Sequence, residues 1–262
     1  MILIIISFII GFYLGKKNSY DIKKNKLRKR FDLELNDFIS YSQYFEDLIL
    51  FCVFYDIKNG FYIDVGANDP NIFSVTKTFY LRGWNGINIE PLPNEYQALV
   101  KYRTRDLNLK IGASDKEGNS TLFVIGMGST LLKNYSNKKT PTINVSVYTM
   151  KNICKKYVPK NINIEFCKID VEGEEKKVLL GYDFKNYRPK VFCIESTIPG
   201  TNIPCHNLWE DILLKNNYSF AFQYEINRYY LDNGNIELKE RFVKANEIIK
   251  NYKKHRTINI YK

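Results

Sequence analysis

Acidic residues stand at the ends of two apolar runs in the second half of the chain. The run from residue 164 leads to Asp170 and Glu172, and the run from residue 190 ends in Glu195. Carboxylates that share one rim repel each other, which raises the pKa of at least one of them unless a cation is present. A carboxylate with a raised pKa can act as general base for a hydroxyl group. The same cluster could hold a hard cation such as Mg²⁺. These three acids are therefore our candidate catalytic residues, with a divalent metal as an open alternative.

A second set of candidate residues follows three apolar runs in the first half of the chain. Asp64 and Gly66 lie at the end of the first run, Glu90 ends the second, and Ser114 and Asp115 follow the third. Glycine lets a ligand approach the backbone because it has no Cβ. An acid at position 90 can accept hydrogen bonds from both hydroxyls of a ribose. This pattern indicates a nucleoside site.

The first of these turns lacks the glycines that bind phosphate. In a GxGxxG fingerprint the second and third glycines would stand where this chain has Asn68 and Asn71. There is no GK[ST] loop either, so a dinucleotide or a nucleoside triphosphate is disfavoured. One glycine and two acids fit a nucleoside with a positive centre and no phosphate, S-adenosylmethionine. Any one of the acids could instead be a helix cap or a surface carboxylate.

All these residues need a parallel sheet to position them, because ligands bind beyond the carboxyl ends of its strands. Apolar runs alternate with helical patterns, which predicts a doubly wound, mostly parallel α/β sheet whose strand order stays open. A β-rich insertion is predicted from two further strands at 120–125 and 143–148. The other predicted strands are 61–65, 86–90, 107–111, 164–170 and 190–195, with a closing hairpin at 218–223 and 228–231. The predicted helices are 40–53, 73–81, 95–103, 149–157, 174–180 and 208–215.

Five segments between about residues 40 and 200 form a set with a characteristic order and spacing. They are YSQYFED at 41–47, FYIDVGANDP at 61–70, GWNGINIEP at 83–91, CKIDVEGEEKKVLLG at 167–181 and RPKVFCIE at 188–195. Together these segments resemble FkbM-type methyltransferases. The resemblance implies a class I methyltransferase (Rossmann-like) fold and S-adenosylmethionine as donor. It also implies acceptors that are hydroxyls on sugars, glycans or polyketide-like natural products.

The resemblance also implies roles for individual residues around the donor. Glu90 would hold the ribose, and Ser114 and Asp115 would border the adenine. Asp69-Pro70 stands where many members carry a glycine, a variant we expect to be tolerated. The implied donor-site residues are Gln43, Asp64, Gly66, Asn68, Glu90, Ser114 and Asp115.

Two segments beyond the third strand could serve the acceptor. His206, after the fifth strand, is an alternative general base, although it could equally start a helix. The sequence GMGST at 126–130 is either a loop on the acceptor side or an ordinary hairpin turn.

The formal charge of +11 is concentrated at the two ends of the chain. Residues 16–30 carry a net +7 and residues 239–262 a net +6, whereas residues 31–238 carry −2. A basic face for nucleic acid is therefore not expected on the globular body. Residues 1–15 are uncharged and apolar, and as a helix they would reach about 22 Å against a hydrocarbon core of roughly 30 Å. A buried core helix is the alternative for this segment.

We expect three regions from this distribution. Residues 1–15 are predicted as a membrane anchor, 16–39 as a basic juxtamembrane stalk and 40–262 as the methyltransferase domain. The positive-inside rule places the stalk and the domain in the cytosol.

Two functions of different classes remain. The first is an O-methyltransferase that acts on a sugar, glycan or glycolipid at a membrane. The alternative is a non-catalytic member that binds a nucleoside or glycan and organises a membrane assembly. Nicotinamide-dependent reduction is disfavoured by the missing glycines.

Overall fold

The computed structural model describes residues 25–26, 28–126, 128–132 and 139–255. The chain divides into two compact units, residues 1–39 and 40–262. In the first unit, residues 28–36 are helical. The predicted membrane anchor at 1–15 lies outside the described residues, as does most of the predicted stalk. Within the described ranges, no helix has both the length and the apolar character needed to cross a bilayer.

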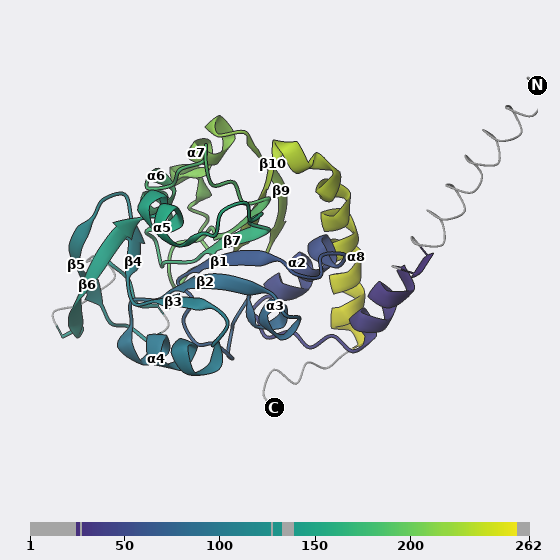
Figure 1. The fold of residues 1–262 in the computed structure, drawn as a ribbon, viewed down its shortest axis with the longest axis horizontal. Coiled ribbons are helices and arrows are strands. Elements are labelled where there is room, and N and C mark those ends of the chain that lie inside the picture. The colour runs from purple at the N-terminus through teal and green to yellow at the C-terminus, as the bar shows by residue number, and fades with distance from the viewer. Residues whose placement is uncertain (1–24, 27, 127, 133–138, 256–262) are drawn as a thin grey trace, which may run out of the picture. The chain divides into compact units, whose positions relative to one another are not determined.

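The second unit is built on a seven-stranded, mostly parallel sheet that fits a methyltransferase fold (Figure 1). Its strand order is β3-β2-β1-β7-β8-β10-β9. Within this sheet, β10 runs in the opposite direction to the other strands. The strands are β1 (Phe61–Val65), β2 (Asn85–Ile89), β3 (Leu107–Leu109), β7 (Phe166–Ile169), β8 (Val191–Glu195), β9 (Tyr218–Tyr224) and β10 (Asn227–Asp232).

The winding of the sheet reverses between β1 and β7. From β1 the chain passes to β2 and β3 on one side, and it returns to β7 on the other side of β1. The register pairs Val65 with Ile89 on one edge of β1 and with Ile169 on the other. Connections that leave a strand in opposite directions open a crevice at its carboxyl end, where ligands of α/β sheets bind. The crevice therefore lies where β1, β2, β7 and β8 end.

The β-rich insertion forms a separate three-stranded sheet with order β4-β6-β5. It consists of β4 (Gly112–Ser114), β5 (Gly118–Phe123) and β6 (Thr142–Thr149). Leu92, Leu122, Val145 and Val147 form a small apolar core beneath it. The predicted strand at 107–111 is shorter than expected, because the chain leaves the central sheet after Leu109 and pairs with β6 from Gly112. As a result, Ser114 does not end a strand of the central sheet.

The six predicted helices occur in the predicted order, two of them beginning well after the predicted residue, and a seventh helix, α8, follows them among the described residues. They are α2 (Glu46–Phe54), α3 (Lys77–Leu81), α4 (Pro93–Tyr102), α5 (Met150–Tyr157), α6 (Glu175–Leu180), α7 (Glu210–Lys215) and α8 (Lys239–His255).

The helix predicted from Ser40 starts only at Glu46, because the buried Asp47 folds the preceding residues into a turn. Its carboxylate accepts hydrogen bonds from the hydroxyls of Ser40 and Ser42 and from the backbone N–H of Tyr41. Short polar side chains that bond to nearby groups in this way favour turns over helix. Helix α3 likewise starts after Phe73, whose φ of 54° is incompatible with a right-handed helix.

The basic carboxyl-terminal segment forms the long helix α8. Its residues Phe242, Ala245 and Ile249 are buried, at the three- to four-residue spacing of one helix face. Figure 1 shows α8 lying beside α2, and the two helices are in contact. Helix α2 is buried along its whole length, so α8 completes the core of the unit on this side.

Candidate active site

A cavity of about 510 Å³ lies at the carboxyl ends of the parallel strands. Its volume falls within the ~300–1,000 Å³ that is usual for small-molecule sites. On one side its wall includes the turns after β1 and β2, and on the other side the ends of β7 and β8, with further residues from the insertion and from the loop at 200–202. The lining includes Gly66, Asn68, Glu90, Asp170, Glu172 and Glu195. Gln43 lines it as well, so seven of the ten residues predicted to form the site meet at one cavity.

The turn after β1 requires glycine at position 66. Gly66 has φ +77°, and a Cβ built on it would lie 1.9 Å from the carbonyl oxygen of Asp170. The backbone N–H groups of Gly66 and Ala67 both donate to the carbonyl oxygen of Ile89, at 3.0 and 3.1 Å. This turn therefore passes closely between β2 and the loop after β7, and a side chain at position 66 would force them apart.

Glu90 holds the same turn from the β2 side. Its Oε2 accepts the backbone N–H of Asn68 and its Oε1 that of Leu92, both at 2.8 Å. Burial raises the pKa of Glu90 to about 7, although these two hydrogen bonds favour the ionised form. A carboxylate oxygen has two lone pairs, so each oxygen keeps one for a ligand hydroxyl. This arrangement can accept both hydroxyls of a ribose.

Asp64 does not line the cavity, in contrast to the role that the resemblance implies, and lies beneath it. It is buried and accepts a hydrogen bond from Thr76 Oγ1 at 2.9 Å. Burial raises its pKa, and the charge of Lys168 opposes that effect. Asp64 therefore supports the floor of the site rather than touching a ligand.

Lys168 is a functional candidate that the sequence reasoning missed. It lies in β7, is 7% exposed, and reaches the cavity wall. Its Nζ donates to the carbonyl oxygen of Gly66 at 2.7 Å and lies 3.5 Å from Asp64 Oδ1 and 3.4 Å from Asp170 Oδ2. Burial works to lower the pKa of Lys168, but the charges of Asp170 and Asp64 outweigh it and raise the pKa. The available signal was a lysine inside an otherwise apolar strand.

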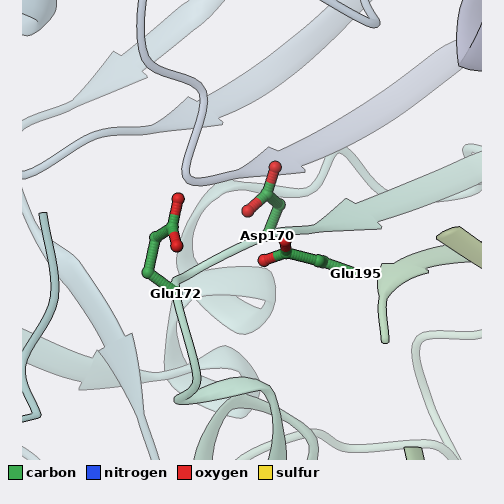
Figure 2. Close-up of side chains that lie close together, drawn as sticks. All are labelled: Asp170, Glu172 and Glu195. Carbon is green, nitrogen blue, oxygen red and sulfur yellow. The ribbon is translucent and has the colours of Figure 1, made fainter. Parts of the chain in front are cut away.

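Figure 2 shows the carboxylates of Asp170, Glu172 and Glu195 directed toward one another. One oxygen from each lies within 4.8 Å of the other two. The alternation of a β-strand does not bring Asp170 and Glu172 together, because β7 ends at Ile169, before either residue. Instead Glu172 adopts a left-handed conformation with φ 54°, and its carbonyl oxygen accepts a hydrogen bond from Thr130 Oγ1 at 2.8 Å.

The carboxyl groups of Glu172 and Glu195 differ in pKa. Burial, followed by the charges of Asp170, Glu172 and Glu175, raises the pKa of Glu195 to about 10. Burial and then Asp170 raise the pKa of the half-buried Glu172 to about 7. Near neutral pH, Glu195 is therefore protonated, whereas Glu172 exchanges a proton readily. Of the two, Glu172 is the better general base.

Glu175 lies in the first turn of the next helix, α6. Its Oε1 accepts the backbone N–H groups of Val171 and Gly173, both at 3.1 Å. Glu174 immediately precedes α6 and forms an ion pair with Lys177. Glu175 therefore holds the loop that carries Asp170 and Glu172.

The remaining predicted residues divide between the cavity and its surroundings. Gln43 lines the cavity. Among the described lining residues, strand β4 contributes Gly112 and Ala113, whereas neither Ser114 nor Asp115 lines the cavity. The carbonyl oxygen of Ser114 packs against Gly181, where a Cβ would come within 2.1 Å of it. On this side the cavity wall therefore ends at Ala113, just before the two residues predicted to border an adenine.

The two acceptor-side segments also differ in position. Gly128 and Ser129 of the GMGST segment line the cavity, and a Cβ on Gly128 would lie 3.9 Å from the Glu172 carboxylate. His206 lies in a 3₁₀ helix, His206–Leu208, and is not among the described lining residues. His206 therefore does not line the cavity in which an acceptor would bind.

Comparison with known proteins identifies one family. The family model described as the methyltransferase FkbM domain matches residues 64–220, more than half of the chain. The match begins at Asp64 and includes Glu90 and the whole acidic cluster. No curated protein matches the chain.

Proposed function

The chain belongs to the FkbM methyltransferase family, and from this premise we propose that it methylates a hydroxyl group of a sugar, glycan or glycolipid at a membrane. Methyltransferases of this kind use S-adenosylmethionine as the methyl donor. The observation that carries the proposal is the single cavity that joins the Gly66 turn and Glu90 to the acidic cluster. A donor and an acceptor bound in its two halves would meet between them.

The donor half suits a nucleoside without phosphates. Glu90 offers free lone pairs to the ribose hydroxyls, and Gly66 brings backbone rather than a side chain to the ligand. The turn contains Asn68 in a left-handed conformation, with φ 50°, and no run of glycines that could surround a pyrophosphate. These features favour S-adenosylmethionine over a dinucleotide.

The acceptor half suits a hydroxyl that must lose a proton. When bound, S-adenosylmethionine supplies its methyl carbon, to which the acceptor oxygen bonds as the bond from that carbon to sulfur breaks. In the cluster without a cation, Glu172 can take the hydroxyl proton, since its pKa of about 7 leaves part of it ionised at neutral pH. Lys168 keeps Asp170 in a fixed position beside it. The remaining requirement is alignment of the oxygen, the methyl carbon and the sulfur.

Support for the membrane location comes from the sequence of residues 1–30. An uncharged apolar segment is followed directly by a stretch with a net charge of +7. Such a basic stretch is attracted to the anionic lipids of a cytosolic leaflet. An acceptor assembled on that surface would be a glycolipid or a lipid-linked glycan.

Titration calorimetry of the full-length protein tests the donor. S-adenosylmethionine should bind and NAD should not; absence of S-adenosylmethionine binding would defeat the proposal. Methyl transfer to a panel of sugar and glycolipid acceptors then tests the reaction. Glu172→Gln should abolish transfer while keeping donor affinity. Donor binding without transfer to any acceptor would favour the non-catalytic alternative.

A separate experiment tests the location. A tagged full-length chain should sediment with membranes, and a chain without residues 1–15 should be released from them. A full-length protein that stays in the soluble fraction would contradict the membrane part of the proposal.

A further inference from the structure

We propose that Asp170, Glu172 and Glu195 hold an oxygen-ligated divalent cation, whose remaining coordination positions take oxygen atoms of the acceptor. The cation site itself follows from the geometry of these three residues. Its use by an acceptor rests on the proposed function.

The spacing of the cluster suits a hard cation. One carboxylate oxygen from each residue lies within 4.8 Å of the others. Mg²⁺ and Ca²⁺ bind oxygen at about 2.0–2.6 Å, so opposite ligands of one ion lie roughly 4–5 Å apart. The three ligands are all carboxylates, a set that selects Mg²⁺, Mn²⁺ or Ca²⁺ over metals that prefer sulfur or imidazole.

A buried oxygen atom in the cluster lacks a partner. Glu195 is 6% exposed, and its Oε2 is buried without a hydrogen-bond partner in the described part of the chain. The Glu195 carboxyl group points toward Asp170 in Figure 2. A buried polar atom that is left unsatisfied destabilises the fold. A cation between the carboxylates would satisfy this atom.

The negative charge of the cluster also favours a bound cation. Lys168 forms an ion pair with Asp170, but its Nζ also lies beside Asp64 and donates a hydrogen bond to the carbonyl oxygen of Gly66. Among the described side chains, no lysine or arginine forms an ion pair with Glu172 or Glu195. A divalent cation would neutralise these two charges. The competing occupant is a proton on Glu195, which neutralises only one.

The cation would lie at the wall of the cavity, where a ligand could contact it. All three carboxylates belong to the lining of the cavity, as do Gly128 and the loop at 200–202. Three protein ligands leave about three of the six positions of an octahedral ion for water or substrate. An acceptor with oxygens on adjacent carbons, such as a sugar diol, could occupy two of them. The site therefore favours a vicinal diol as the acceptor group.

Manganese titration tests the cation site without donor or acceptor. The full-length protein is first treated with a chelator, and binding of Mn²⁺ is followed by the decrease in the electron paramagnetic resonance signal of the free ion. We expect one Mn²⁺ per chain, displaced by Mg²⁺ or Ca²⁺. Glu195→Gln and Glu172→Gln should each weaken binding by about tenfold or more, because each removes one charged ligand. The exposed Asp211→Asn should leave binding unchanged.

The outcomes separate this inference from the proposed function. No stoichiometric Mn²⁺ site in the wild-type protein, or a site unaffected by both glutamine variants, overturns the inference even if methyl transfer is observed. A site that is lost in both variants, while they still bind S-adenosylmethionine normally, supports it whether or not an acceptor has been found. Retained donor binding also shows that the variants are folded. Should Glu195→Gln fail to fold, the result for Glu172→Gln on the cavity wall decides the question.

Discussion

The side chain of Lys168 donates a hydrogen bond of 2.7 Å to the carbonyl oxygen of Gly66. The same Nζ atom lies 3.4 Å from Asp170 Oδ2. One buried cation thus connects the turn of the donor half to the acidic cluster of the acceptor half. Since the two halves must be aligned for methyl transfer, Lys168 is a positioning residue for the reaction.

Lys168→Met should alter both the alignment and the protonation of the cluster. The charge of Lys168 works to lower the pKa of Glu172, so its removal should shift the acidic limb of the pH–rate profile to higher pH. Turnover should fall by about tenfold or more, because loss of orientation is costly in such reactions. Breaking a buried charge pair also costs about 3–5 kcal/mol of stability. Steady-state kinetics across pH and urea unfolding measure these effects.

Lys190 provides the matched control, because it lies at the amino ends of β7 and β8, whereas the cavity lies at their carboxyl ends. Its Nζ lies 2.6 Å from Glu165 Oε2, just before β7 and β8 begin. Lys190→Met should reduce stability but leave the pH–rate profile in place, and Lys168→Arg should restore part of the turnover. An equal shift of the profile in Lys190→Met would show that Lys168 has only a structural role.

Gly66→Ala tests the close approach between the turn and the loop after β7. The added Cβ would lie 1.9 Å from the Asp170 carbonyl oxygen, so the turn or the loop must move. Donor affinity should fall by about tenfold or more, as measured by calorimetry. Gly83→Ala is the control, because Gly83 also has a positive φ, +90°, but open space where the Cβ would be.

The Gly83→Ala variant should lose only about 1–2 kcal/mol of stability from its backbone conformation and should bind the donor normally. A larger stability loss in Gly66→Ala than in Gly83→Ala is therefore expected. Equal donor affinities in the two variants would argue against the turn at Gly66 as part of the donor site.

Sequence patterns were sufficient for the inner strands β1, β7 and β8 of the central sheet, because these strands are buried on both faces. A strand such as β1 or β8 is a short, continuous apolar run, which is the expected pattern in a parallel sheet. The position of Glu90 and Glu195 at the strand ends followed from the same runs. The order of the strands could not be predicted, because it depends on pairings between segments far apart in the chain.

The prediction failed where side chains control the backbone locally or where two segments meet. The turn before α2 forms around the Asp47 carboxylate, and Ser114 leaves the donor edge because β4 pairs with β6. The role of Lys168 depends on the register between β1 and β7. No spacing in the sequence reveals that register. The membrane anchor stays a prediction, as it lies outside the described residues.

Glu90→Gln should weaken donor binding specifically. The backbone N–H groups of Asn68 and Leu92 bond to different oxygens of Glu90, so in the amide one of them would face an NH₂ group, which cannot accept a hydrogen bond. The amide also offers a ribose one acceptor fewer. Hydrogen bonds to a charged group contribute about 1.5–3 kcal/mol each, so the dissociation constant should rise by about tenfold or more. Glu95→Gln, in the first turn of α4, is the control. Similar affinities in both variants would contradict the ribose assignment.

The stability of the metal-free protein should decrease as the pH rises from about 5 to 8. The pKa is raised to about 7 for Glu90 and Glu172 and to about 10 for Glu195. The folded protein therefore binds more protons than the unfolded chain above the ordinary glutamate value of 4.5, and stability present below that value is lost as these groups ionise. Glu195→Gln cannot ionise, so its stability should decrease less, with an advantage over wild type of about 1–3 kcal/mol at pH 8. Urea unfolding in the presence of chelator measures the difference at each pH. Parallel stability curves for the two proteins would show that Glu195 carries no raised proton affinity in the fold.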